Sequence, residues 1–214
     1  MKHKIEKNTV QETLILPLYS RKLCTELYPN LYQDETAVRL IDEIDYDFSE
    51  AEKNSRSLMQ RFGALEVAMR QNDLVWEVRD YLKTHPSAAV FFASGVFYYF
   101  LTEQVRALVQ RMADAFSGSV LVFDAANRTA VKMIAKTWLR TAKIKDVGAY
   151  FAVSDAPKEI GEWNNRLQVT SRGYMLGYND LRDTSVSGFF RFLARVGDNG
   201  MKMQIVKIRF GGKA

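Results

Sequence analysis

Two short apolar runs separated by one amphipathic stretch constrain the fold of this chain more than any other feature. The first run covers residues 89–93 and the second covers residues 119–123. Continuous apolar runs of this length are typical of strands buried on both faces of a parallel sheet. Between them, apolar residues recur at helical spacing at Val105, Leu108, Val109, Met112 and Phe116. A strand–helix–strand order of this kind joins parallel strands in a right-handed connection, so the sequence predicts an α/β fold.

The segment before the first run has helical periodicity instead. We expect one helix over residues 10–27 and a second over residues 35–44, for which Asp34 is a suitable N-cap. A longer helical stretch covers about residues 51–84, where apolar residues recur three and four positions apart. Gly63 is a candidate position for a kink in this stretch.

The C-terminal part mixes helices and strands. We expect helices over residues 131–138, 157–163 and 188–196, strands over residues 167–171 and 201–210, and a turn at residues 197–200. Thr102 is expected to cap the helix between the two apolar runs. These patterns divide the chain into an N-terminal helical cap with lead-in helices, residues 1–86, and an α/β core, residues 87–214.

Five short motifs stand in a fixed order along the chain. They are Val10 to Tyr19 (VQETLILPLY), Asp45 to Phe48 (DYDF), Ala68 to Arg70 (AMR), Ser94 to Phe100 (SGVFYYF) and Val120 to Asp124 (VLVFD). As an ordered set spanning residues 8–211, they resemble the leucine carboxyl methyltransferase superfamily. The resemblance is closest to its bacterial branch, the tetracenomycin polyketide O-methyltransferase-like family.

The resemblance implies a Rossmann-like class I methyltransferase sheet behind an N-terminal helical cap. It also implies S-adenosylmethionine as cofactor and methyl transfer to a carboxylate or hydroxyl oxygen of a small-molecule acceptor. A fold of this kind binds its cofactor at a glycine-rich turn after the first strand, where the backbone approaches the ligand closely. An acidic residue after the second strand then binds the ribose hydroxyls.

Neither of these two elements is in the sequence. After residues 88–90 the chain continues directly into residues 91–95, which resemble the family's fourth strand and the loop after it. About two strand–helix units, at ~30 residues for each βαβ unit, would fill the gap. Three explanations stay open: a segment that belongs to the molecule but not to this sequence, a genuine deletion, or a different small α/β fold. The alternative function is a non-catalytic, truncated methyltransferase-like protein that acts as a binding or assembly module.

Four residues are candidates for cofactor binding. Arg70 matches a family arginine expected near the cofactor carboxylate, and a planar guanidinium suits bidentate carboxylate binding. Ser94, Gly95 and Tyr99 follow the first apolar run, and ligands of open α/β sheets bind at the carboxyl ends of strands. The alternative for Arg70 is a solvated position on a helix, and for the others a strand-end turn beside core aromatic residues.

Five further residues are candidates for catalysis and substrate binding. The resemblance makes Tyr19 a candidate for positioning the acceptor oxygen, and Asp124 a candidate base or polar wall. Thr13 and Arg21 belong to the N-terminal segment that covers the active site in the family, and Tyr98 is a candidate wall of the substrate pocket. Ordinary helical packing, helix capping and core packing are the alternatives for these positions.

Composition excludes several other classes. The net charge of +5 comes from 30 basic against 25 acidic residues, but no run of five like charges occurs, so we expect no nucleic acid partner. The longest apolar run, residues 88–101, is shorter than the ~20 residues of a membrane helix, so we expect no membrane partner. The single cysteine, Cys24, fits a reducing, cytoplasmic location. With only His3 and His85 as histidines, we expect no metal site.

The first apolar run also bears on assembly. If the segment is deleted, the strand at residues 89–93 loses the neighbour that it has in the family sheet. The run has no charge or proline to protect it, and unprotected edge strands pair with other chains. We therefore expect a chain with this deletion to form a homo-oligomer, with residues 58–100 at its interface.

Overall fold

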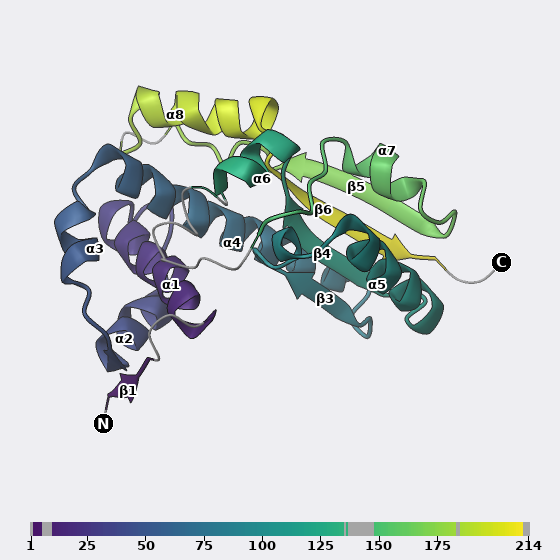
Figure 1. Cartoon of the computed structure of the whole chain (residues 1–214), viewed down its shortest axis with the longest axis horizontal. Coiled ribbons are helices and arrows are strands. Elements are labelled where there is room, and N and C mark those ends of the chain that lie inside the picture. The colour runs from purple at the N-terminus through teal and green to yellow at the C-terminus, as the bar shows by residue number, and fades with distance from the viewer. Residues whose placement is uncertain (1, 6–9, 135, 137–147, 183–184, 212–214) are drawn as a thin grey trace.

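A computed structural model describes residues 2–5, 10–134, 136, 148–182 and 185–211 (Figure 1). The described chain is a mixed α/β protein. Its N-terminal helices lie at one end and its main sheet lies at the other, and the long helix α4 extends from the first part to the second (Figure 1).

The N-terminal part is helical, as predicted. Its helices are α1 (Val10–Leu27), α2 (Glu35–Glu43), α3 (Ser49–Asn54) and α4 (Leu58–Thr84), and two short strands, β1 (His3–Lys4) and β2 (Ile44–Asp45), pair in parallel. The Asp34 side chain caps α2 by accepting a hydrogen bond from the Ala37 N–H at 2.9 Å, which confirms the predicted N-cap. The single stretch expected over residues 51–84 is divided in two. The division falls at Ser57, whose hydroxyl accepts a hydrogen bond from the Gln60 N–H at the start of α4.

The main sheet has four strands. They are β3 (Val90–Ala93), β4 (Val120–Ala125), β5 (Leu167–Gly173) and β6 (Gln204–Phe210), in the order β3-β4-β6-β5. Strands β3 and β4 are parallel neighbours, with Val90 opposite Val120, which confirms the prediction for the two apolar runs. Strand β6 is antiparallel to both β4 and β5, so the sheet is mixed rather than wholly parallel.

Helices cover both faces of this sheet. The remaining elements are α5 (Thr102–Ala115), α6 (Arg128–Ile134), α7 (Ala156–Gly161), α8 (Gly188–Arg195) and the short helical turns η1 (Phe97–Tyr99) and η3 (Val196–Gly200). Side chains of a strand alternate between faces. One face of β4 therefore packs with Leu65 and Met69 of α4, through Val120 and Val122. The other face packs Leu121 and Phe123 against α5 and α7.

Several local expectations differ from the structure. Leu101, rather than Thr102, occupies the N-cap of α5, and its N–H donates to the Gln104 side-chain oxygen at 2.8 Å. The segment expected as a turn at residues 197–200 continues α8 as the helical turn η3, because the chain stays helical past Arg195. The predicted helix over residues 131–138 lies partly outside the described residues.

The largest difference concerns β3. The sequence pattern predicts a buried strand, but Phe92 is 58% exposed, because β3 forms an edge of the described sheet. Among the described helices, none has both the length and the apolar character needed to cross a membrane.

Candidate functional site

A buried polar cluster lies where β3 and β4 end. We call it the Arg70 cluster, and it consists of Glu66, Arg70, Tyr98, Asp124 and Tyr174. Asp124 is near the end of β4, and its side chain is fully buried. Its Oδ1 accepts a hydrogen bond of 2.6 Å from the Gly95 N–H, and its Oδ2 lies 3.4 Å from Nη1 of Arg70. Asp124 therefore joins the loop after β3 to helix α4.

Gly95 is required in this loop by its backbone conformation. Its φ is +67°, in the left-handed region that residues with a Cβ rarely adopt. A Cβ at this position would lie 3.7 Å from the Arg70 guanidinium nitrogens, an ordinary van der Waals contact, so the backbone conformation and not the space favours glycine. The turn directs the Gly95 N–H toward Asp124.

Burial dominates the electrostatics of the cluster. It raises the pKa of the Glu66 carboxyl, although Arg70 and a hydrogen bond of 3.2 Å from the Tyr174 hydroxyl oppose this shift. Burial also raises the pKa of both the Tyr98 and the Tyr174 hydroxyl well above the usual value, so both stay neutral near pH 7. The Tyr98 hydroxyl lies close to Asp124 but outside hydrogen-bond geometry, and the buried Nε of Arg70 also has no hydrogen-bond partner among the described residues.

The structure brings together much of the predicted site. Arg70, Gly95, Tyr98 and Asp124 come from three separate motifs and meet in or beside the Arg70 cluster. Tyr99 follows Tyr98 in η1. Burial raises the pKa of the Tyr99 hydroxyl above its usual value, although nearby Arg70 acts in the opposite direction. Ser94 directly precedes Gly95 and is partly buried.

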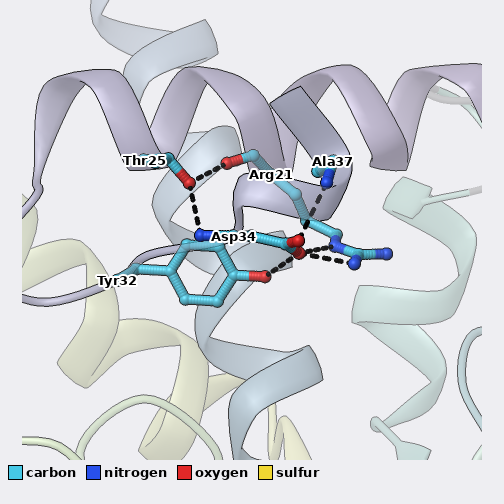
Figure 2. Close-up of polar contacts among 5 residues, drawn as sticks. All are labelled: Arg21, Thr25, Tyr32, Asp34 and Ala37. Atoms are coloured by element: carbon cyan, nitrogen blue, oxygen red, sulfur yellow. Dashed lines mark hydrogen bonds and ion pairs between the residues drawn. The ribbon is translucent and has the colours of Figure 1, made fainter. Parts of the chain in front are cut away.

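The N-terminal candidates make their contacts elsewhere. Tyr19 stacks on Phe48, with 5.4 Å between the ring centroids. The Nε of Arg21 donates to Oδ2 of Asp34 at 2.8 Å, and the Tyr32 hydroxyl donates to the same oxygen at 3.0 Å (Figure 2). Arg21 therefore links α1 to the start of α2. Thr13 lies in α1, but its side chain is outside the described part of the chain.

Figure 2 also shows how Asp34 is held. Burial acts to raise the pKa of the Asp34 carboxyl, but hydrogen bonds from the Ala37 N–H, Arg21 and Tyr32 outweigh it, so the pKa lies below the usual value. Thr25 completes the arrangement, since its hydroxyl accepts from the Asp34 N–H and donates to the Arg21 carbonyl oxygen. This network gives Arg21 a structural role, which is to hold α1 against the start of α2.

Sequence reasoning missed the three acidic residues of a charged stripe on α4 that also contains the predicted Arg70. Glu66, Arg70, Asp73 and Glu77 follow one another at intervals of four, three and four residues, which places them on one face of a helix. This spacing in a helix with many buried apolar residues was the signal that could have revealed them. The stripe faces the sheet side of the molecule, where Asp73 and Glu77 are both buried.

Asp73 and Glu77 hold the segment after β5. The Met175 N–H and the Asn179 side-chain amide donate to the two oxygens of Asp73, at 3.1 and 2.9 Å. The Tyr178 hydroxyl donates to Glu77 at 2.7 Å. Burial raises the pKa of Asp73 to about 7, although its two hydrogen bonds act in the opposite direction.

The Arg70 cluster fits only one end of S-adenosylmethionine. The unpartnered Nε of Arg70 suits a carboxylate such as that of the methionine portion. However, Asp124 already contacts both the arginine and the Gly95 N–H. The chain also has no glycine-rich turn for close backbone approach and no ribose-binding acid in the expected place. The residues present therefore do not fit the complete cofactor.

Comparison with protein-family models, curated proteins and solved structures finds no match. Within the described ranges, no three His, Cys, Asp or Glu side chains gather in a way that could hold a metal ion. A cavity of about 410 Å³ lies away from the Arg70 cluster, between the end of α4 and strands β5 and β6.

Proposed function

We propose that this chain is an O-methyltransferase-like protein of the leucine carboxyl methyltransferase type that acts as a non-catalytic assembly module. Two features support the relationship. The parallel neighbours β3 and β4 correspond to the fourth and fifth strands that the resemblance implies. Arg70, Tyr98 and Asp124, which the resemblance selects, lie together with Gly95 at the carboxyl ends of these strands.

The open edge at β3 is the observation that carries the assembly role. Strand β3 pairs only with β4 in the described sheet, so one side of its backbone is left without strand partners. Large apolar side chains are exposed there and in the segment that follows, which we call the β3 edge patch: Phe92, Val96, Tyr99, Phe100 and Leu101. Exposed apolar side chains beside an unpaired strand edge favour association with another chain.

A second copy of this chain is the occupant that fits best. The open edge needs a partner strand for its N–H and C=O groups, and an identical β3 offers the same unpaired groups. Residues 90–93 carry no charge, so antiparallel pairing of two copies about a twofold axis places no like charges opposite each other. Such pairing would join two four-stranded sheets into one continuous sheet.

Sedimentation velocity tests this proposal with one edge variant and one matched control. Phe92→Lys adds a charge to the open strand, and Phe189→Lys adds the same charge at a phenylalanine of α8 with a similar exposure, 53% against 58%. We expect a wild-type dimer, a dissociation constant raised at least tenfold in Phe92→Lys, and no change in Phe189→Lys. A wild-type monomer at high concentration, or equal weakening by both variants, would contradict the proposal.

Methyl transfer itself is the second candidate function. The specific observation in its favour is the buried Arg70 Nε, which lies near the ends of β3 and β4 and has no hydrogen-bond partner among the described residues. S-adenosylmethionine would supply the methyl group, and the acceptor would be a small acid or phenol.

Calorimetry with S-adenosylmethionine, on protein whose chain mass is verified as 24.5 kDa, separates the two candidates. We expect no micromolar binding, because the residues fit only one end of the cofactor. Micromolar binding that is weakened by Arg70→Ala would reject the non-catalytic assignment.

A further inference from the structure

A polar groove lies on the side of the sheet opposite α5 and α7. Its walls come from the last turns of α4 and from β5 and β6, and it is lined by Glu77, Asp80, Tyr81, Thr84, His85, Gln168, Thr170, Ser171, Arg172, Ile205, Lys207 and Arg209. Its volume of about 410 Å³ is in the range of small-molecule sites, ~300–1,000 Å³. The groove shares no residue with the Arg70 cluster or with the β3 edge patch.

Two arginines of this groove are held in place by aromatic rings. The Arg172 guanidinium lies over Trp76 and Tyr178, at 5.1 and 4.8 Å from the ring centroids. The Arg209 guanidinium lies over Tyr81, at 5.4 Å. Stacking uses the flat face of a guanidinium and leaves the N–H groups at its edge available to anionic oxygens.

Neither arginine has a carboxylate partner among the described residues. The ion pairs there include Lys207 with Glu77, but none includes Arg172 or Arg209. The Arg209 side chain instead lies 3.3 Å from Nε2 of His85. The groove therefore contains two oriented guanidinium groups that form no ion pair among the described residues, and its two carboxylates, Glu77 and Asp80, pair with Lys207 and Lys83.

The sheet register sets the spacing of the backbone positions that carry these charges. Arg209 is opposite Gln168 and Arg172 is opposite Ile205, so the two arginines are four positions apart along the ladder. At ~3.3 Å per residue, this separation is about 13 Å. Lys207 is opposite Thr170, midway between them, so three cationic side chains form a row along the groove.

We propose that this groove binds an elongated, multiply phosphorylated small molecule. Arg172 and Arg209 stand at the two ends of the row without a carboxylate partner and suit phosphate oxygens, while Lys207 between them already pairs with Glu77. The hydroxyl of Thr170 lines the same groove and can donate to one of the further oxygens that a phosphate has and a carboxylate lacks. This binding does not depend on the proposed assembly role.

Isothermal calorimetry with inorganic tripolyphosphate tests the proposal. The double variant Arg172→Gln/Arg209→Gln removes both arginines of the groove. The double variant Arg106→Gln/Arg111→Gln is the control, because it removes the same charge from exposed positions on α5, on the other face of the sheet. We expect wild-type binding that weakens at least tenfold in the groove variant and less than twofold in the control. Thermal melting checks that both variants are folded.

Three outcomes would overturn the proposal. The first is no wild-type binding at millimolar tripolyphosphate, and the second is equal weakening in the two double variants, which would indicate general charge attraction. The third is tighter binding of a single-stranded oligonucleotide or of citrate through the same two arginines. An oligonucleotide result would assign the groove to nucleic acid, and a citrate result would assign it to carboxylates.

Discussion

The chain after each of the two edge strands, β3 and β5, donates a backbone N–H to a buried aspartate, but the charges of these two aspartates are compensated differently. After β3, the Gly95 N–H donates to the buried Asp124. After β5, the Met175 N–H donates to the buried Asp73. In each case a buried carboxylate fixes the chain just after an edge strand.

The difference lies in what compensates the charge of each aspartate. Asp124 forms an ion pair with Arg70. Asp73 has no ion pair among the described residues, and burial raises its pKa to about 7. A buried carboxylate that lacks a cation avoids the cost of its charge by binding a proton. The end of β3 is therefore held by an ion pair, and the end of β5 is held by a carboxyl group that changes charge near neutral pH.

The exposed surfaces beside the two edge strands differ too. The β3 edge patch is apolar and uncharged, whereas β5 presents Gln168, Thr170 and Arg172 to the polar groove. Charged and polar side chains protect a sheet edge from pairing with other chains. This contrast supports assembly at β3 and small-ligand binding beside β5.

The largest effect is expected from breaking the ion pair at β3. Asp124→Ala leaves Arg70, whose side chain is 19% exposed, without its carboxylate and the Gly95 N–H without its acceptor. Removing one partner of a buried pair costs about 3–5 kcal/mol, so we expect a loss of that size in the free energy of unfolding. Urea denaturation measures it.

Asp114→Ala is the control for this prediction, because Asp114 pairs with Arg166 but its side chain is 62% exposed. Exposed pairs contribute about 0–1 kcal/mol, so the control should lose far less stability. If both variants lost the same amount, burial would not be the reason for the contribution of Asp124.

A smaller, pH-dependent effect is expected at β5. The pKa of Asp73 in the folded state, about 7, is above its ordinary value, so the folded state binds this proton more tightly than the unfolded state. The free energy of unfolding should therefore fall as pH rises from about 4 to about 7, by at most ~1.4 kcal/mol per pH unit from this group. Asp73→Asn should reduce that slope in urea denaturation at about pH 5.5 and pH 7.

Neighbouring charges define the control for the pH prediction. The charges of Glu77 and Arg172 shift the pKa of Asp73, and burial also raises the pKa of Asp198, which interacts with Asp73, to about 7. Part of the pH slope of the free energy of unfolding should therefore remain in Asp73→Asn. Asp80→Asn removes a solvent-accessible carboxylate from the same helix and should leave the slope unchanged. A slope equal in Asp73→Asn and wild type would assign the pH dependence to other groups.

The smallest effect is expected from the charge beside the β5 edge. Arg172→Gln removes an exposed guanidinium that stacks on Trp76 and Tyr178, an interaction of about 0.5–1 kcal/mol. We expect a loss of that size in the free energy of unfolding, with the sheet intact by circular dichroism. A loss as large as that of Asp124→Ala would mean that the two edges depend equally on their charges.

Local features of the fold followed from the sequence because their causes are local. The apolar runs at residues 89–93 and 119–123 lie in strands β3 and β4, which are parallel neighbours, as their pattern and the helix between them predict. Asp34 caps α2 because its side chain can reach an N–H only three residues away. The resemblance selected Arg70, Tyr98 and Asp124, and the position of Gly95 at the end of a predicted strand selected Gly95.

The tertiary structure decided the features that depend on distant residues. The sequence has no local pattern that inserts β6 between β4 and β5, because strand order depends on pairing between segments far apart in the chain. Arg70 and Asp124 are 54 positions apart, and Asp73 and Met175 are 102 positions apart. The sequence by itself therefore indicated most of the long helices and the strands of the main sheet, but not the division between α3 and α4 or the helical turn η3. Packing decided which buried carboxylate gained a cation, because only the folded chain brings these charges within reach of each other.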